Sequence, residues 1–264
     1  MLHVSHMAVM LMVGLFAFTT TALAESAVPW SQADSYDDPD DMAAARHHVR
    51  RHHGGQTNYL IAADRLEYQT ADDVRTFLWD VQGWYGGDIN KLLLKSEGDF
   101  SFSEDAIEEA EVQALWSRAI SPYFDLQAGV RWDFEPDDRV HGVLGVRGTV
   151  PYGFNIDAST FVSGQGDVTA RIEIEYEIKV TKRLGVEPRV ELELAAQDIP
   201  DLNVGAGITD FDLGIRAHYE VRREITPYIG VELQAAFGDT AAIVRGMGGD
   251  PRQTVFVVGV SAWF

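Results

Sequence analysis

The last eleven residues of the chain alternate between two kinds of side chain. Phe256, Val258, Val260, Ala262 and Phe264 occupy every second position. Because successive side chains in a strand point to opposite faces, these five residues share one face. The chain therefore ends in a predicted strand with a continuous apolar face and an aromatic last residue.

Other segments repeat this alternation and carry charges on the second face. In residues 168–180, Ile172 and Ile174 alternate with Glu173 and Glu175, and residues 186–194 and 211–221 follow the same pattern. A helix would scatter these charges around its circumference. The pattern predicts strands that each have one apolar face and one charged face.

We count roughly twelve such segments, an even number as in bacterial single-chain barrels. They begin near Leu60, Val74, Ile89, Glu108, Tyr123, Arg139, Gly153, Val168, Gly185, Thr209, Tyr228 and Gln253. A soluble two-sheet sandwich also alternates, so the connections between strands must decide between the two folds.

Short and long connections are predicted to alternate along the chain. The short ones are residues 86–88, 119–122, 150–152, 181–184 and 223–227, and the longer ones are 98–107, 133–138, 197–208 and 238–252. Short turns at one end and long loops at the other are typical of outer-membrane barrels, as is a terminal Phe after alternating apolar residues. We therefore expect an all-β fold, a transmembrane antiparallel outer-membrane β-barrel of about 12 strands.

Aromatic residues recur beside the predicted short turns. Tyr123, Tyr152 and Tyr228 each follow a proline, and Trp84-Tyr85 closes another strand. Tyr and Trp suit the lipid headgroup zone, so these residues predict an aromatic girdle at the periplasmic end. Ordinary turn composition is the alternative explanation.

The charged faces are expected to point into the barrel. Arg or Lys on a lipid face costs roughly 2–4 kcal/mol near the bilayer midplane. Inward candidates outside the three dense strands are Asp80, Lys91, Lys95, Glu97, Glu111, Asp125, Arg131 and Asp157. Either opposite charges on neighbouring strands pair and fill a narrow lumen, or the excess carboxylates form a cation path.

Three regions are predicted along the chain. Residues 1–24 resemble a secretory signal peptide, with an apolar stretch from Ala8 and an Ala22-Leu23-Ala24 cleavage pattern, although a membrane anchor is an alternative. Residues 25–57 are acidic and His-rich with few large apolar residues, so we expect a short disordered arm. Residues 58–264 form the barrel. If Phe264 ends at the periplasmic rim, an even strand count puts the arm in the periplasm.

Composition excludes some functions. The formal net charge is −20, which disfavours a nucleic-acid partner because phosphate binding needs clustered Lys and Arg. The chain has no cysteine, so it contains no disulfide, thiolate metal site or Cys nucleophile.

Several blocks of the chain between Asp64 and Phe264 carry a family resemblance. The most specific block is Gly83-Trp84-Tyr85-Gly86-Gly87-Asp88, preceded by Gln82, and others are residues 79–80, 91, 94–95, 97–98, 111–113, 117–122, 125–131, 175–177 and 222–231. These blocks resemble the copper resistance protein B family, the outer-membrane CopB/PcoB type. The resemblance implies an outer-membrane protein that binds or exports copper beside a periplasmic multicopper oxidase, with copper as cargo. Family members often carry a long Met- and His-rich segment, whereas the arm here is short and acidic, and Met42 is its only methionine.

The arm offers metal donors on chemical grounds as well. His47, His48, His52 and His53 lie close together near carboxylates. Imidazole suits Cu(II) and the Met42 thioether suits Cu(I), so these residues are candidate copper ligands. Zn(II) or Ni(II) would accept the same donors, and a solvated linker without metal is the alternative.

Within the barrel, His218 is expected to face inward with Asp212 and Glu220 on the same strand face, which makes these three residues further candidate ligands. A hydrogen-bonded histidine in a polar lumen is the alternative.

We expect no enzyme activity, because the sequence has no G-x-S-x-G elbow, and Ser159 or Ser163 with a distant His141 does not make a persuasive nucleophile and base. A narrow cation-selective porin or a structural barrel without a metal role is the stronger rival function.

A peptide covering Asp40 to Gly55 should release heat on binding copper at neutral pH in calorimetry. Ligation needs neutral imidazole, so the heat should decline below about pH 6.5. Absence of copper heat at neutral pH would remove the assigned role of these histidines.

Overall fold

The structure is a computed structural model that describes residues 32–53, 56–71 and 74–264. The chain divides between Gly54 and Gly55 into two units, each described by itself. The predicted signal peptide lies outside the described residues. Within the described residues no helix is long and apolar enough to cross a membrane.

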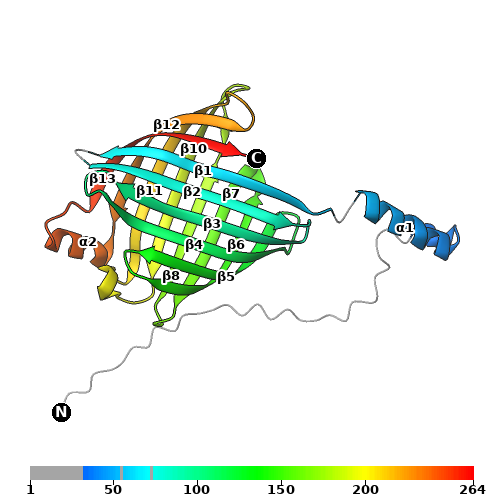
Figure 1. The fold of residues 1–264 in the computed structure, drawn as a ribbon, viewed down its shortest axis with the longest axis horizontal. Coiled ribbons are helices and arrows are strands. Elements are labelled where there is room, and N and C mark those ends of the chain that lie inside the picture. The colour runs from blue at the N-terminus through cyan, green and yellow to red at the C-terminus, as the bar shows by residue number, and fades with distance from the viewer. Residues whose placement is uncertain (1–31, 54–55, 72–73) are drawn as a thin grey trace, which may run out of the picture. The chain divides into compact units, whose positions relative to one another are not determined.

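The larger unit is a closed antiparallel barrel of twelve long strands (Figure 1). Each long strand pairs with the long strands before and after it in the sequence, and β1 pairs with β13 to close the ring. A two-residue strand, β9, extends the hairpin before β10. The strands are β1 (Asn58–Ala71), β2 (Val74–Gly86), β3 (Asn90–Ser101), β4 (Ala106–Ala119), β5 (Phe124–Glu135), β6 (Arg139–Val150), β7 (Phe154–Ser163), β8 (Val168–Tyr176), β9 (Ile178–Lys179), β10 (Leu184–Ala195), β11 (Gly207–Tyr219), β12 (Ile225–Ala236) and β13 (Arg252–Trp263).

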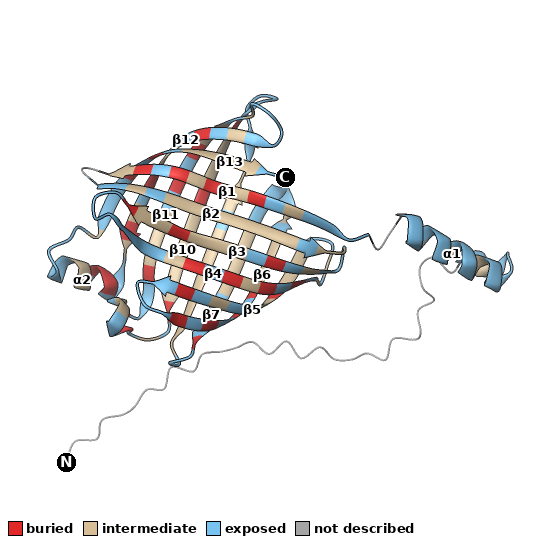
Figure 2. Ribbon diagram, in the orientation of Figure 1, coloured by how far each residue is buried: buried red, intermediate tan, exposed pale blue. Residues whose placement is uncertain are grey.

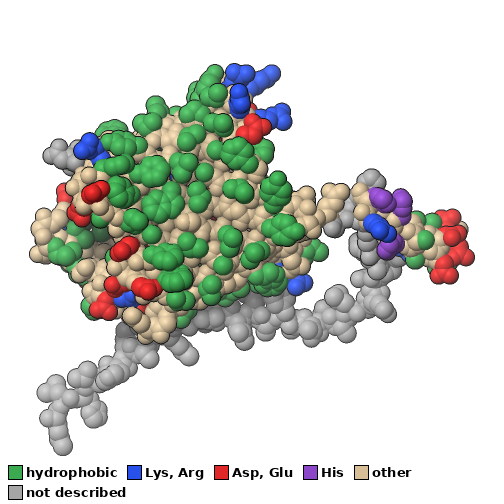
Figure 3. All heavy atoms as spheres, in the orientation of Figure 1, with side chains coloured by type: hydrophobic (Ala, Val, Ile, Leu, Met, Phe, Trp, Pro, Cys, Tyr) green, Lys and Arg blue, Asp and Glu red, His purple; other side chains and the backbone are tan. Residues whose placement is uncertain are grey.

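The expected barrel of about twelve strands is confirmed. At the closing seam, the Ile61 amide donates to the Phe264 carbonyl at 3.0 Å and the Phe264 amide donates back at 2.8 Å. Phe256 and Val258 project outward and are exposed, as the alternation predicts. Figure 3 shows hydrophobic side chains covering the visible wall of the barrel, with charged side chains gathered near its ends.

The two ends of the barrel differ. The turn end holds the start of β1, the end of β13 and the short turns such as residues 87–89 and 120–123. The loop end holds two long loops, 196–206 with η3 (Pro200–Leu202) and 237–251 with α2 (Gly238–Gly246). The prediction of long loops at residues 98–107 and 133–138 is wrong. Strands β3, β4 and β5 extend further than expected, so the connections are only residues 102–105 and 136–138.

The aromatic girdle is only partly as expected. Tyr85, Tyr123 and Tyr152 are exposed on the turn end. Tyr228 instead points into the lumen and is 4 % exposed, since it shares the inward face of β12 with Glu232. Trp84 also points inward, against the lumen core.

The smaller unit contains helical segments within the predicted arm. Residues Pro39–His53 form the helix α1, preceded by the short η1 (Gln32–Ser35). The Asp38 carboxylate accepts the Asp40 amide at 2.8 Å and caps the first turn, and proline suits its first position. Arg46 pairs with Asp34 of η1 at 2.5 Å, which holds the two helical segments together.

A small apolar core lies inside the barrel. Leu93, Leu115, Val143 and Phe161 from β3, β4, β6 and β7 are buried together. Gly129 of β5 lies between Leu115 and Val143 in register, so its missing side chain lets the two residues approach. Figure 2 shows buried and exposed residues alternating along these strands.

Replacing Gly129 by alanine should destabilise the barrel. A Cβ there would overlap the Ala114 carbonyl and lie 2.8 Å from the Leu115 Cα. Overpacking of this kind costs about 1–3 kcal/mol, measurable by denaturant unfolding of the detergent-solubilised protein. Gly142→Ala is the matched control, because its Cβ would meet only the Val162 carbonyl at 4.0 Å. Equal stability of the two variants would contradict this account of Gly129.

Candidate functional site: the charged lumen

Arginine side chains cross the lumen and join opposite walls. Arg171 of β8 lies 2.9 Å from Glu97 of β3 and 3.5 Å from Glu111 of β4, on strands that are not its neighbours. It also lies 2.9 Å from Glu193 of β10. Lys95 of β3 reaches Asp157 of β7 at 2.7 Å in the same way. The expected inward direction of these charged faces is therefore confirmed.

Two further arginines complete this layer of ion pairs. Arg189 of β10 contacts Glu173 at 3.0 Å and Glu191 at 2.8 Å. Arg65 of β1 contacts Glu97 at 3.0 Å, so that carboxylate is shared between Arg65 and Arg171. Both arginines are buried. Each buried charge thus has an opposite charge within reach, as burial requires.

A second buried group lies against the wall formed by β1, β11 and β12. Arg216 donates to Glu67 at 2.7 Å and to Glu232 at 2.8 Å, and the Tyr228 hydroxyl donates to Glu67 at 3.1 Å. Glu67 is completely buried. Gly259 leaves the space that the Tyr228 ring occupies.

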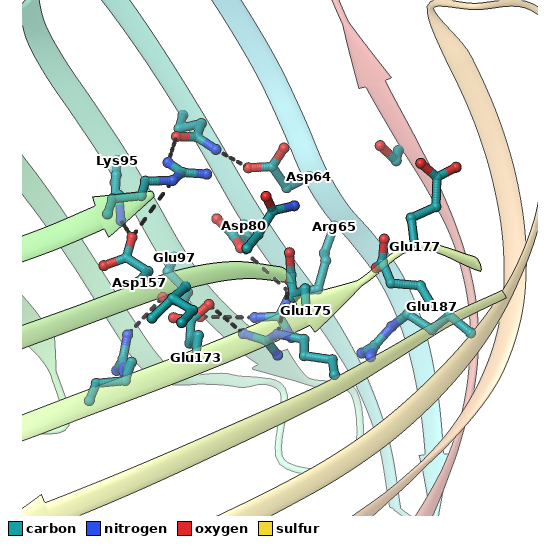
Figure 4. Close-up of a pocket in the computed structure, with 18 of the residues that line it drawn as sticks. Asp64, Arg65, Asp80, Lys95, Glu97, Asp157, Glu173, Glu175, Glu177 and Glu187 are labelled. Atoms are coloured by element: carbon teal, nitrogen blue, oxygen red, sulfur yellow. Dashed lines mark hydrogen bonds and ion pairs between the residues drawn. The ribbon is translucent and has the colours of Figure 1, made fainter. Parts of the chain in front are cut away.

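The ion pairs divide the lumen into two chambers. The turn-side chamber, with a volume of about 480 Å³, opens toward the turn end (Figure 4). The loop-side chamber, with a volume of about 580 Å³, opens toward the long loops. Five residues line both chambers, and we call them the waist: Arg65, Glu97, Phe161, Arg171 and Arg189.

Charge is distributed unequally between the chambers. Eight carboxylate and six basic side chains line the turn-side chamber. Fourteen carboxylates and five arginines line the loop-side chamber. Of the carboxylates in the loop-side chamber, Asp99, Glu109, Asp210 and Asp212 have no Lys or Arg nitrogen within 4.0 Å in the part of the chain that the structure describes. The loop-side chamber therefore attracts cations.

The lumen candidates for metal binding do not come together. His218 lines the turn-side chamber, 3.6 Å from Glu187, with its ring against Tyr228. Asp212 lines the loop-side chamber, six residues or about 20 Å away along β11. Glu220 lies just beyond the end of β11.

The arm candidates all belong to α1. His47, His48 and His52 are exposed, and the rings of His48 and His52 lie 4.3 Å apart. His53 is the last residue of the helix, and Met42 is half-buried near its start. Across residues 32–53, 56–71 and 74–264, no group of three or more His, Asp or Glu residues is arranged to hold a metal ion.

Register places Ser163 opposite His141, in contrast to the separation expected from the sequence. The Ser163 hydroxyl nevertheless donates to Asp167 at 3.2 Å and accepts two backbone amides of the β7–β8 turn. His141 lies 3.0 Å from Asp133. The hydrogen bonds of the Ser163 hydroxyl therefore stabilise the β7–β8 turn, and none of them joins Ser163 to His141.

Sequence reasoning missed the waist as a unit. The alternation along each strand could have indicated that three arginines face the lumen: Arg65, Arg171 and Arg189. Their shared partners Glu97 and Glu191 lie on other strands, so alternation alone could not identify the pairs.

Comparison with known proteins agrees with this architecture. The profile of the family described as "Copper resistance protein B precursor (CopB)" matches residues 57–264, the whole barrel. The chain belongs to the copper resistance protein B family. It is 39% identical to Copper resistance protein B of Escherichia coli over 227 residues, which cover 85% of this chain and 76% of that protein. It is 36% identical over 213 residues to a Copper resistance protein B homolog of Pseudomonas syringae pv. tomato, covering 80% and 72%.

A solved structure shares the barrel fold of this family member. The NanC porin has a TM-score of 0.51 at 11% identity, and the match covers 78% of this chain and 99% of that one. The KdgM porin has a TM-score of 0.47 at 15% identity, covering 77% and 98%. The NanC match supports an outer-membrane type of barrel and nothing finer.

Replacing Arg171 by alanine should open the waist. We expect a severalfold increase in single-channel conductance in planar bilayers, because the side chain that joins β8 to β3 and β4 is removed. Arg147→Ala is the control, since Arg147 lines only the turn-side chamber and is half-buried. Unchanged conductance in Arg171→Ala would show that the waist does not limit flow.

Proposed function

We propose that this protein is an outer-membrane copper resistance protein that binds copper ions and contributes to their sequestration or export across the outer membrane. Membership of the copper resistance protein B family over the whole barrel supports the copper role. The single structural observation that carries the proposal is the carboxylate excess of the loop-side chamber, because it favours a cationic cargo.

The loop-side chamber is proposed to attract copper that has passed the waist from the turn side. Copper ions that reach this chamber find carboxylate oxygens, including those of Glu109 and Asp210, that have no Lys or Arg nitrogen within 4.0 Å in the described chain. Carboxylate oxygens bind cations weakly enough to release them, as passage requires. The ion pairs of Arg171 and Arg189 limit which ions pass from the turn side into this chamber.

The orientation follows from the usual arrangement of such barrels. Short turns face the periplasm and long loops face outward. The turn end, where β1 starts, is therefore proposed to lie in the periplasm, after removal of residues 1–24 as a signal peptide. On this basis residues 25–57 are a periplasmic arm that holds copper, outer-membrane lipid surrounds the wall, and a periplasmic multicopper oxidase is the proposed partner.

A narrow cation-selective porin is the second candidate. Carboxylates attract many cations, and His141 and His218 are the only imidazoles that line the two chambers of the described barrel. The two functions differ in selectivity, because a copper protein must favour copper over Na⁺ or K⁺. We propose no catalytic step for either.

Copper survival and cellular copper content in a deletion strain test the proposal. The wild-type gene should restore both values. A variant with His47, His48, His52 and His53 changed to alanine should restore them only in part if the arm participates. Full rescue by that variant would remove the arm from the function and leave the barrel.

Liposome flux separates copper handling from a porin. Purified protein should pass copper in preference to Na⁺, and Asp210→Asn with Asp212→Asn should reduce this preference because two unpaired carboxylates are lost. Equal passage of copper and Na⁺ in the wild type would favour the porin, and failure of the gene to restore copper survival would end the proposal.

A further inference from the structure

We infer that His48 and His52 together form a divalent-cation site on one face of α1, with Cu(II) as the preferred ion. The ring centroids of the two histidines lie 4.3 Å apart, and both side chains are exposed. The inference rests on the proposed function for its biological role, since it names the ligands by which the arm holds copper.

Helix geometry brings these two imidazoles together. Residues four apart on an α-helix lie on the same face, one turn apart, with Cβ atoms about 5–6 Å from each other. Rotation about the side-chain bonds can direct one nitrogen of each ring at a common ion. Two histidines at this spacing on a helix are a known arrangement for binding a divalent metal.

His47 and Met42 lie on other faces of α1 than this pair. Adjacent residues on a helix point about 100° apart, so His47 points away from the face that His48 and His52 share. Met42 is half-buried and lies one turn before Arg46, on the face held against η1 by the Arg46–Asp34 ion pair. The site therefore contains nitrogen donors and no thioether.

The chemistry of the site selects its ligand class. Imidazole donors suit borderline divalent ions, and the affinity order of such ions peaks at Cu(II), above Ni(II) and Zn(II). Both histidines lie in the last two turns of α1, where the helix dipole favours positive charge. Water completes the coordination, so the ion remains exchangeable. Binding links two successive turns, so it also stabilises the helix.

Electron paramagnetic resonance of Cu(II) added to the full-length protein in detergent tests the inference. The wild type should show coupling to two imidazole nitrogens. His48→Ala and His52→Ala should each lose one nitrogen and weaken Cu(II) binding about tenfold or more, because one imidazole remains. His47→Ala should leave the spectrum and the affinity unchanged. Ni(II) and Zn(II) should each displace Cu(II) only when present in excess.

The outcomes separate this site from the proposed function. An equal loss in His47→Ala would overturn the His48–His52 pair, as would a wild-type spectrum with only oxygen donors. In both cases copper resistance by the barrel would stand. Normal Cu(II) binding by His48 and His52 in a protein that fails to restore copper survival would support the site and reject the proposed function. Unchanged heat-modifiable mobility in gels checks that each variant retains the barrel.

Discussion

A guanidinium or carboxylate withdrawn from water costs several kcal/mol unless an opposite charge and hydrogen bonds compensate for it. The lumen of this barrel meets that condition through arginines shared among carboxylates of several strands. Arg171 of β8 forms ion pairs with carboxylates of β3 and β4. One of these carboxylates, Glu97, also pairs with Arg65 of β1. These contacts hold opposite walls at a set distance. The position of the waist, and hence the division into two chambers, depends on them.

The same pairing decides where uncompensated charge remains. Three arginines form their ion pairs at the waist: Arg65, Arg171 and Arg189. Arg216 forms its ion pairs with Glu67 and Glu232 at the barrel wall. Few basic groups are left for the loop end, where carboxylates such as Asp210 and Asp212 have no Lys or Arg within reach in the described chain. The attraction for cations is therefore a local property of one chamber. A net charge of −20 alone did not specify that location.

The arm follows a different physical rule. Its sequence has few of the large apolar residues that order a chain by burial, which led to the expectation of disorder. Local interactions are sufficient instead: an Asp38 cap, consecutive alanines from Ala43 to Ala45 and the Arg46–Asp34 pair. The helix then decides which histidines are neighbours. The four histidines lie close together in the sequence, and helical periodicity brings His48 and His52 onto one face.

By itself the sequence determined the strand alternation, the inward direction of charge, the approximate strand count and the family, because a period of two along each strand is local information. The sequence wrongly predicted Tyr228 in the aromatic girdle and predicted two connections, 98–107 and 133–138, that are longer than those observed. Both features depend on strand register and on the residue at which strand pairing ends. Only the tertiary structure decided which charges pair across the lumen, that Gly129 lets Leu115 and Val143 meet, and that the chambers differ in charge. Closure of the ring brings residues from distant strands within a few ångströms, and no pattern along the chain encodes those distances.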